Sequence, residues 1–241
     1  MSLDNDASAT PRREFLGQMV LAAAVIASTA CAPAIAASSA SPTPRPVPTP
    51  PAAPLPKQSW DDSWTQRLTA AKHKAVFDSP EMGEGVALWQ AALILSGYHD
   101  ALDAAEGDVV PVIVMRHAGV PLAFGDALWE KYEIARELKL KDPHTGRPYT
   151  RNPYLSAPSD ASGMEATATL AGLRAKGAVL LACNLAAMGY AARIAARTKQ
   201  DVAAVRAEGR AGLAPGVILQ PSGIYATIRA QEMGAAFMRS T

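Results

Sequence analysis

Asp108 to Met115 (Asp-Val-Val-Pro-Val-Ile-Val-Met) has the clearest strand pattern in the chain. A short, continuous, β-branched apolar run is typical of a strand buried on both faces of a sheet. Pro111 lacks a backbone N–H, so it indicates either an outer strand or a missing hydrogen bond in the ladder. Arg116 and His117 follow directly, which places two polar side chains at the carboxyl end of this strand.

Shorter apolar runs predict three more strands, and amphipathic or alanine-rich segments between them predict helices. The other predicted strands cover 74–77, 178–182 and 216–219. The predicted helices cover 59–72, 85–102, 124–138, 164–176, 185–198, 201–208 and 223–238. Alternation of this kind predicts an α/β fold, namely a three-layer α/β/α sandwich around a mostly parallel sheet of four to five strands.

The N-terminus has the pattern of a twin-arginine export signal. Arg12 and Arg13 precede Phe-Leu and an uncharged stretch whose apolar core is too short to span a membrane. A small-x-small site predicts cleavage after Ala36, so residues 1–36 are interpreted as a signal peptide. The alternative is lipidation at Cys31, which would tether the protein to a membrane. Either way, the twin-arginine translocase is a predicted partner through the arginine pair, and the periplasm is the predicted location.

Residues 37–58 are interpreted as a linker, because half of the residues in 41–56 are proline. Such a segment favours extended polyproline II over a packed core, and it would reach roughly 50 Å. The alternative is a PxxP ligand for a partner. Residues 59–241 remain as one domain of ordinary size.

Composition and spacing exclude several classes of function. The chain has 23 Lys plus Arg and 22 Asp plus Glu, a net charge of +1, and no basic run that would indicate nucleic-acid binding. It contains no His or Cys spacing typical of a metal site, and no glycine-rich phosphate loop follows a predicted strand. We therefore expect no metal and no cofactor.

The carboxyl ends of parallel strands meet at one edge of the sheet, where ligands of open α/β folds bind. The residues expected there are candidates for catalysis or for ligand binding. The catalytic candidates are Cys183, His117 and Arg116, and the ligand-binding candidates are Asp78, Asn184, Gln220 and Ser222.

Cys183 admits two interpretations. It ends a predicted strand and precedes a helix that Asn184 can cap, and a helix N-terminus stabilises a thiolate, as a nearby Arg116 would. Alternatively, it completes the buried face of its strand as a small apolar residue. His117 is likewise either an acid or base beside the thiol or a residue that closes the strand end by hydrogen bonding. Ser222 is interpreted as the N-cap of the last helix.

Residues 139–163 form a long, polar, proline-containing connection. Segments of this length in a compact domain are often lids or interface arms. The alternative is plain disorder.

Four segments resemble the exported, twin-arginine-signal branch of the DsrE-like (DsrE/DsrF/YchN-type) family. They are His73–Phe77, Arg116–Phe124, Cys183-Asn184 and Pro215–Gly223. The resemblance implies the same α/β fold over most of residues 60–238 and a homo-oligomer. In that family a cysteine at the comparable place carries sulfur as a persulfide.

The resemblance predicts a sulfurtransferase-like persulfide carrier, in which Cys183 accepts sulfane sulfur, Arg116 favours the thiolate and His117 assists proton transfer. Two alternatives remain. One is a non-catalytic module that binds a small ligand at the strand ends. The other is a periplasmic assembly protein that engages partners through the 139–163 segment and the proline-rich spacer.

Overall fold

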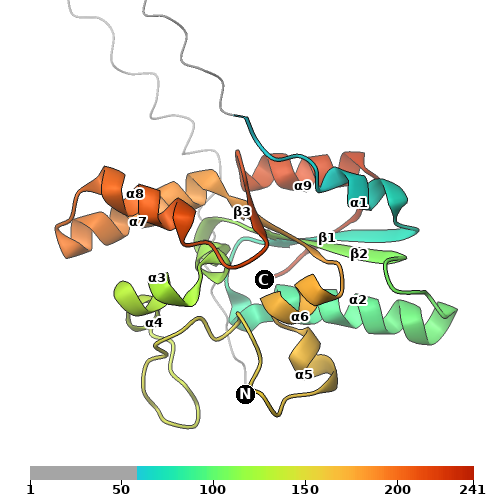
Figure 1. Cartoon of the computed structure of the whole chain (residues 1–241), viewed down its shortest axis with the longest axis horizontal. Coiled ribbons are helices and arrows are strands. Elements are labelled where there is room, and N and C mark those ends of the chain that lie inside the picture. Colours follow the sequence, from blue (N-terminus) through green and yellow to red (C-terminus); the bar gives the residue numbers. More distant parts are fainter. Residues whose placement is uncertain (1–58) are drawn as a thin grey trace, which may run out of the picture. The chain divides into compact units, whose positions relative to one another are not determined.

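The computed structural model describes residues 59–241, so the predicted signal peptide, Cys31 and the linker lie outside the described residues. Five strands form one sheet in the order β4-β3-β2-β1-β5, and every neighbouring pair is parallel (Figure 1). This confirms the predicted three-layer α/β/α sandwich. The strands are β1 (His73–Ser79), β2 (Val109–Met115), β3 (Val179–Cys183), β4 (Val217–Gln220) and β5 (Ala236–Arg239).

Alternate residues of each strand point to opposite faces of the sheet, so the sheet separates two apolar layers. On one face, Val76, Val112 and Val114 pack with α1 (Thr65–Ala70) and α9 (Gly223–Glu232). Figure 1 shows these two helices together on that side.

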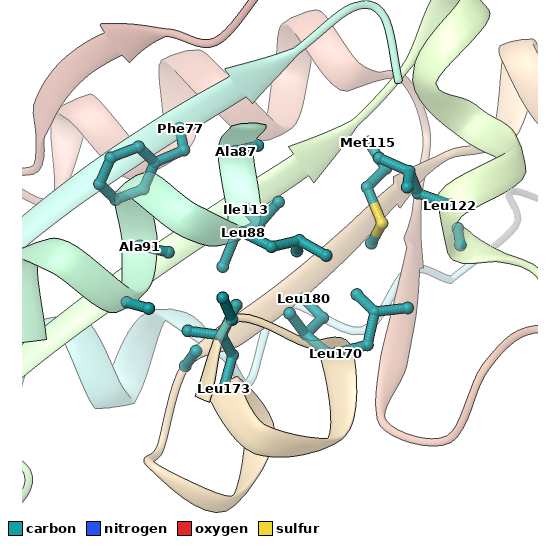
Figure 2. Close-up of a cluster of buried hydrophobic side chains, with 14 of the residues drawn as sticks. Phe77, Ala87, Leu88, Ala91, Ile113, Met115, Leu122, Leu170, Leu173 and Leu180 are labelled. Atoms are coloured by element: carbon teal, nitrogen blue, oxygen red, sulfur yellow. The ribbon is translucent and has the colours of Figure 1, made fainter. Parts of the chain in front are cut away.

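On the other face the strands pack against α2 (Val86–Leu102) and α6 (Leu170–Ala175). Figure 2 shows Ile113 and Leu180 of the sheet facing Leu88 and Leu173 of these helices. Burial of apolar surface on both faces explains why the strand sequences are almost continuously apolar.

A further apolar cluster joins the remaining helices beside the sheet. It contains Trp129, Tyr132, Tyr190, Ile194 and Val205. The helices are α3 (Asp126–Lys131), α4 (Ile134–Glu137), α7 (Asn184–Thr198) and α8 (Val202–Ala211), and the short elements α5 (Gly163–Thr167), η1 (Gly83–Gly85) and η2 (His117–Ala123) complete the order. No helix within residues 59–241 has the length and apolar character needed to cross a membrane.

Pro111 lies in the central strand, so the outer-strand interpretation of this residue is wrong. The pairing explains how the sheet accommodates it. β2 pairs with β3 only from Val112 onward, whereas β2 pairs with β1 along its whole length. One flank of β2 therefore has no partner strand at Pro111, and the missing N–H need not remove a ladder bond.

The prediction of one helix over 223–238 is wrong at its C-terminal end. Helix α9 ends at Glu232, Gly234 adopts a φ of +85°, and β5 then pairs with β1. Glycine allows the left-handed conformation that reverses the chain after the helix. β5 is thus the fifth strand of the sheet, at its edge.

Two predicted helices are interrupted. The 124–138 segment forms α3 and α4, because Glu133 between them has a φ of +45°. The 164–176 segment forms α5 and α6, and the Thr169 hydroxyl caps α6 by accepting the Gly172 N–H at 3.0 Å. The predicted 59–72 helix is shorter than expected, with α1 spanning six residues.

The 139–163 segment is anchored to the domain through its second half. Buried Asn152 donates from Nδ2 to the carbonyl oxygens of Leu122 (2.9 Å) and Phe124 (2.7 Å). Its first half forms a turn in which Asp142 accepts the His144 N–H at 2.8 Å. These contacts favour a fixed arm over plain disorder.

Candidate functional site

The carboxyl edge of the sheet brings most of the predicted site residues together. In the strand register, Ser79 stands opposite Met115, Met115 opposite Ala182, and Cys183 opposite Gln220. The strands therefore end at nearly the same level, and the residues that follow them share one edge, as the parallel topology requires.

Asp78 and Arg116 form a two-point ion pair at this edge. Arg116 donates from Nε to Oδ1 of Asp78 at 2.6 Å and from Nη2 to Oδ2 at 2.7 Å. The Asp78 side chain is 5% exposed and that of Arg116 is 28% exposed. The hydrogen bond to Asp78 is the main cause of the raised pKa of Arg116. The Asp78 carboxylate is thus already bound by Arg116. Much of the charge of Arg116 is in turn neutralised by this carboxylate.

The aliphatic stem of Arg116 packs against the first residue of α9. A Cβ on Gly223 would lie 2.5 Å from Cβ and 2.7 Å from Cδ of Arg116. The glycine therefore lets the helix approach the arginine closely. The glycine is visible in the sequence as part of the Pro-Ser-Gly stretch. Only the fold shows that Arg116 is the side chain that requires a glycine there.

Cys183 caps helix α7 through its sulfur atom. Sγ accepts the N–H of Ala186 at 3.3 Å, and Cys183 is 6% exposed. Asn184 is the first residue of the helix, so the expectation that Asn184 caps it is wrong. The sulfur stands at the positive end of a 15-residue helix, where a negative charge is stabilised.

Arg116 lies within electrostatic range of Cys183. An electrostatic interaction with Cys183 contributes to the raised pKa of Arg116, after the stronger effects of Asp78. Cys183 also belongs to none of the three hydrophobic clusters described above. The thiol is nonetheless buried, as expected if Cys183 completes the buried face of its strand as a small apolar residue.

His117 begins η2 and is exposed, with a φ of +49°. Its side chain makes no hydrogen bond within residues 59–241. The hydrogen bond by which His117 was expected to close the strand end is therefore absent from these residues. The chain turns sharply here because Gly119 sits against the end of β1. A Cβ at Gly119 would lie 2.5 Å from the Ser79 carbonyl oxygen. Sequence reasoning gave Gly119 no role.

Two buried side-chain oxygens at this edge have no hydrogen-bond partner within residues 59–241. They are Oε1 of Gln220 and Oδ1 of Asn184. The orientation of Gln220 is well defined, because Nε2 donates to the carbonyl oxygens of Asp61 (2.7 Å) and Leu219 (3.2 Å). Buried acceptors without donors are costly, so a hydrogen-bond donor that reaches either oxygen would be stabilising.

The Ser222 hydroxyl is hydrogen-bonded to the backbone of α9. Its hydroxyl accepts the Tyr225 N–H at 3.0 Å, which confirms the predicted N-cap. Exposed apolar side chains stand in the first turn of α7 (Leu185) and in the first two turns of α9 (Ile224 and Ile228). This apolar rim was not predicted from the sequence.

Within residues 59–241, no group of three or more His, Cys, Asp or Glu residues is placed to hold a metal ion. Two cavities of about 590 and 460 Å³ are lined by residues away from the carboxyl edge. Cys183 lines neither of these two cavities.

Comparison of the chain with protein-family models, with curated proteins and with solved structures finds no match.

Proposed function

We propose that this chain is an exported DsrE-like protein that carries sulfane sulfur on Cys183 in the periplasm. The observation that carries the proposal is the hydrogen bond from the Ala186 N–H to Sγ of Cys183. A sulfur anion at this position gains both that bond and the field of the helix N-terminus. The same two features would stabilise a terminal persulfide less directly, because its charge lies one atom farther out.

The chemistry needs no external oxidant. The Cys183 thiolate attacks the outer sulfur of thiosulfate or of a polysulfide, so a new S–S bond forms and the S–S bond of the donor breaks. The electron pair of the broken bond leaves with the donor, as sulfite or as a shortened polysulfide. Because Cys183 is only slightly exposed, the donor must be small and unbranched at the reacting sulfur.

Arg116 and His117 have different roles in this proposal. The two hydrogen bonds of Arg116 to Asp78 make it a positioning residue that holds the ends of β1 and β2 beside the thiol. His117 is exposed and can exchange protons with solvent, which suits transfer of a proton to an acceptor.

Mass spectrometry of the intact protein after incubation with thiosulfate or polysulfide tests the proposal. We expect an adduct of about 32 Da, one sulfur atom, that is removed by a thiol reductant. Cys183→Ser is the matched control and should gain nothing. An adduct-free Cys183 that also resists mild alkylation would contradict the proposal.

A second candidate function is a module that binds a small hydrogen-bond donor without reacting with it. The unpartnered oxygens of Gln220 and Asn184 favour this candidate. It predicts that Cys183→Ala leaves ligand binding intact, whereas Gln220→Leu abolishes it. Thermal-shift screening of the two variants with amine and amide ligands distinguishes this function from sulfur transfer.

A homo-oligomer is proposed from the family resemblance, and the exposed apolar rim of Leu185, Ile224 and Ile228 supports it. Ile224→Glu should lower the molar mass measured by light scattering. Deleting residues 141–148, which precede the Asn152 anchor, tests whether the arm contributes. An unchanged mass in both variants argues against assembly through these parts.

Export is proposed from Arg12 and Arg13, which lie outside the described residues. Replacing both arginines with lysine should retain the protein in the cytoplasm. Fractionation of cells that express the two forms measures this directly. Radiolabelled palmitate incorporation, with Cys31→Ala as the control, decides between cleavage after Ala36 and lipidation.

A further inference from the structure

A cavity of about 460 Å³ lies at the amino ends of β3 and β4, away from Cys183. Its wall includes Trp64 and Arg67 of the N-terminal segment, Arg174 at the end of α6, and Val179 and Ile218 of the sheet. Cavities of a few hundred cubic ångströms are of the size that holds small organic ligands.

Two arginines in this wall have no acidic partner within the described part of the chain. Neither Arg67 nor Arg174 makes a salt bridge or a side-chain hydrogen bond within residues 59–241. The two carboxylates closest in sequence to Arg67 have other partners, because Asp61 accepts the Ser63 N–H at 2.9 Å and Asp62 pairs with Arg229 at 3.3 Å. The cavity wall therefore carries two exposed guanidinium groups that are not engaged by a carboxylate of the described residues.

The placement of Arg174 depends on a glycine. Gly216 has a φ of +83°, and a Cβ there would collide with Cδ of Arg174. The turn before β4 thus leaves room for the arginine stem to lie across its backbone. Both arginines are in the last turns of their helices, where a cation is favoured, but that effect does not require them to share a cavity.

A third polar group in the wall is also unsatisfied. The Nε1–H of Trp64 is buried and has no acceptor within residues 59–241. A buried donor without a partner is unfavourable, so an acceptor that reaches Nε1 would be stabilising. The rest of the wall is mainly apolar, with Val179 and Ile218 in the same hydrophobic cluster as Trp64, and Ser63 is a further polar residue of the wall.

We propose that this cavity binds a small organic anion whose phosphate, sulfonate or carboxylate group is held by Arg67 and Arg174. The apolar body of the ligand packs against Trp64 and the strands. Guanidinium groups suit such oxyanions because they offer several N–H donors in one plane. This site is independent of the proposed sulfur chemistry at the opposite end of the strands.

Isothermal titration with phenyl phosphate tests the proposal, with inorganic phosphate and phenol as the two partial ligands. We expect phenyl phosphate to bind more tightly than either. Arg67→Gln and Arg174→Gln should each weaken it about tenfold or more, as expected for loss of a charged hydrogen bond. Quenching of tryptophan fluorescence should accompany binding, because Trp64 lines the cavity.

Arg210→Gln is the matched control, since Arg210 is an exposed arginine in the last turn of α8 and does not line the cavity. That variant and Cys183→Ala should bind phenyl phosphate as the unaltered protein does. Absence of saturable binding up to about 10 mM would overturn the proposal, since weaker affinities are not distinguishable from non-specific contact. Equal affinity in the Arg67, Arg174 and Arg210 variants would overturn it as well. Loss of sulfur uptake in Cys183→Ala with retained anion binding would separate the two sites.

Discussion

Arg116 contacts Asp78 through two parallel hydrogen bonds of 2.6 and 2.7 Å across 38 residues of sequence. The pair connects the ends of two adjacent strands, and α9 packs on the arginine stem at Gly223. The central part of the candidate site is therefore held by a partly buried ion pair, and Cys183 lies within electrostatic range of its arginine.

Asp78→Asn should destabilise the protein by about 1–3 kcal/mol, because the buried carboxylate of a partly buried pair is lost while the arginine charge remains. Urea denaturation measures the change. Glu133→Gln removes the partner of Arg136 in an exposed pair and is the control, with an expected effect below about 0.5 kcal/mol. Equal losses of stability in the two variants would show that the Asp78 pair stabilises the protein no more than an exposed pair does.

Gly119→Ala should destabilise the protein by about 2 kcal/mol or more, because its methyl group would overlap the carbonyl oxygens of Ser79 and Glu81. The variant should also shift η2 and so change the rate at which Cys183 is alkylated. Gly97→Ala, in α2 with open space around its Cα, is the control and should be neutral or slightly stabilising. Thermal unfolding and timed alkylation provide the two measurements.

Asn152→Ala should free the 139–163 arm from the domain. Two hydrogen bonds to carbonyl oxygens are lost, and those oxygens become unpaired in a buried site, at a cost of about 2 kcal/mol. Limited proteolysis should then cut the arm faster than in the unaltered protein. The exposed neighbour Arg151, changed to Ala, should leave the cleavage rate unchanged; faster cleavage there too would mean that the anchor has no specific role.

Glu208 should make stability depend on pH in the acid range. Its pKa is lowered from the ordinary value of 4.5, first by the Lys131 hydrogen bond and then by that of Tyr132. A lowered folded-state pKa gives stability that is present above pH 4.5 and is lost as the pH falls through the folded-state value.

Urea midpoints between about pH 3 and pH 7, the range around this titration, should therefore decline toward acid, and less steeply in Glu208→Gln. Glu165→Gln, at an exposed position on α5, serves as the control and should retain the full slope. Identical slopes in the protein and both variants would remove Glu208 as the cause.

The strands could be predicted from sequence because their signal is local. A continuous apolar run such as 109–115 satisfies both faces of a parallel sheet wherever the strand lies in it. The same locality explains the errors. Pro111 could not show whether β2 is paired at that residue on the side opposite β1. The short β5 follows a helical pattern in which Gly234 is the only break.

The sequence predicted which residues stand at the candidate site but not how they interact. Strand-end positions of Asp78, Arg116, Cys183 and Gln220 followed from the parallel topology. Their hydrogen-bond partners did not, because a polar side chain can bind any donor or acceptor that the fold brings near it. Only the structure pairs Asp78 with Arg116 and assigns the cap of α7 to Cys183.

The sequence by itself determined the α/β class, the order of most elements and the edge at which the polar residues gather, since hydrophobic periodicity and strand ends are properties of neighbouring residues. Only the tertiary structure decided the strand order, the partner of each buried charge and the meeting of Arg67 with Arg174 in one cavity. Those features depend on contacts between segments far apart in the chain, and such contacts arise from packing the whole core at once.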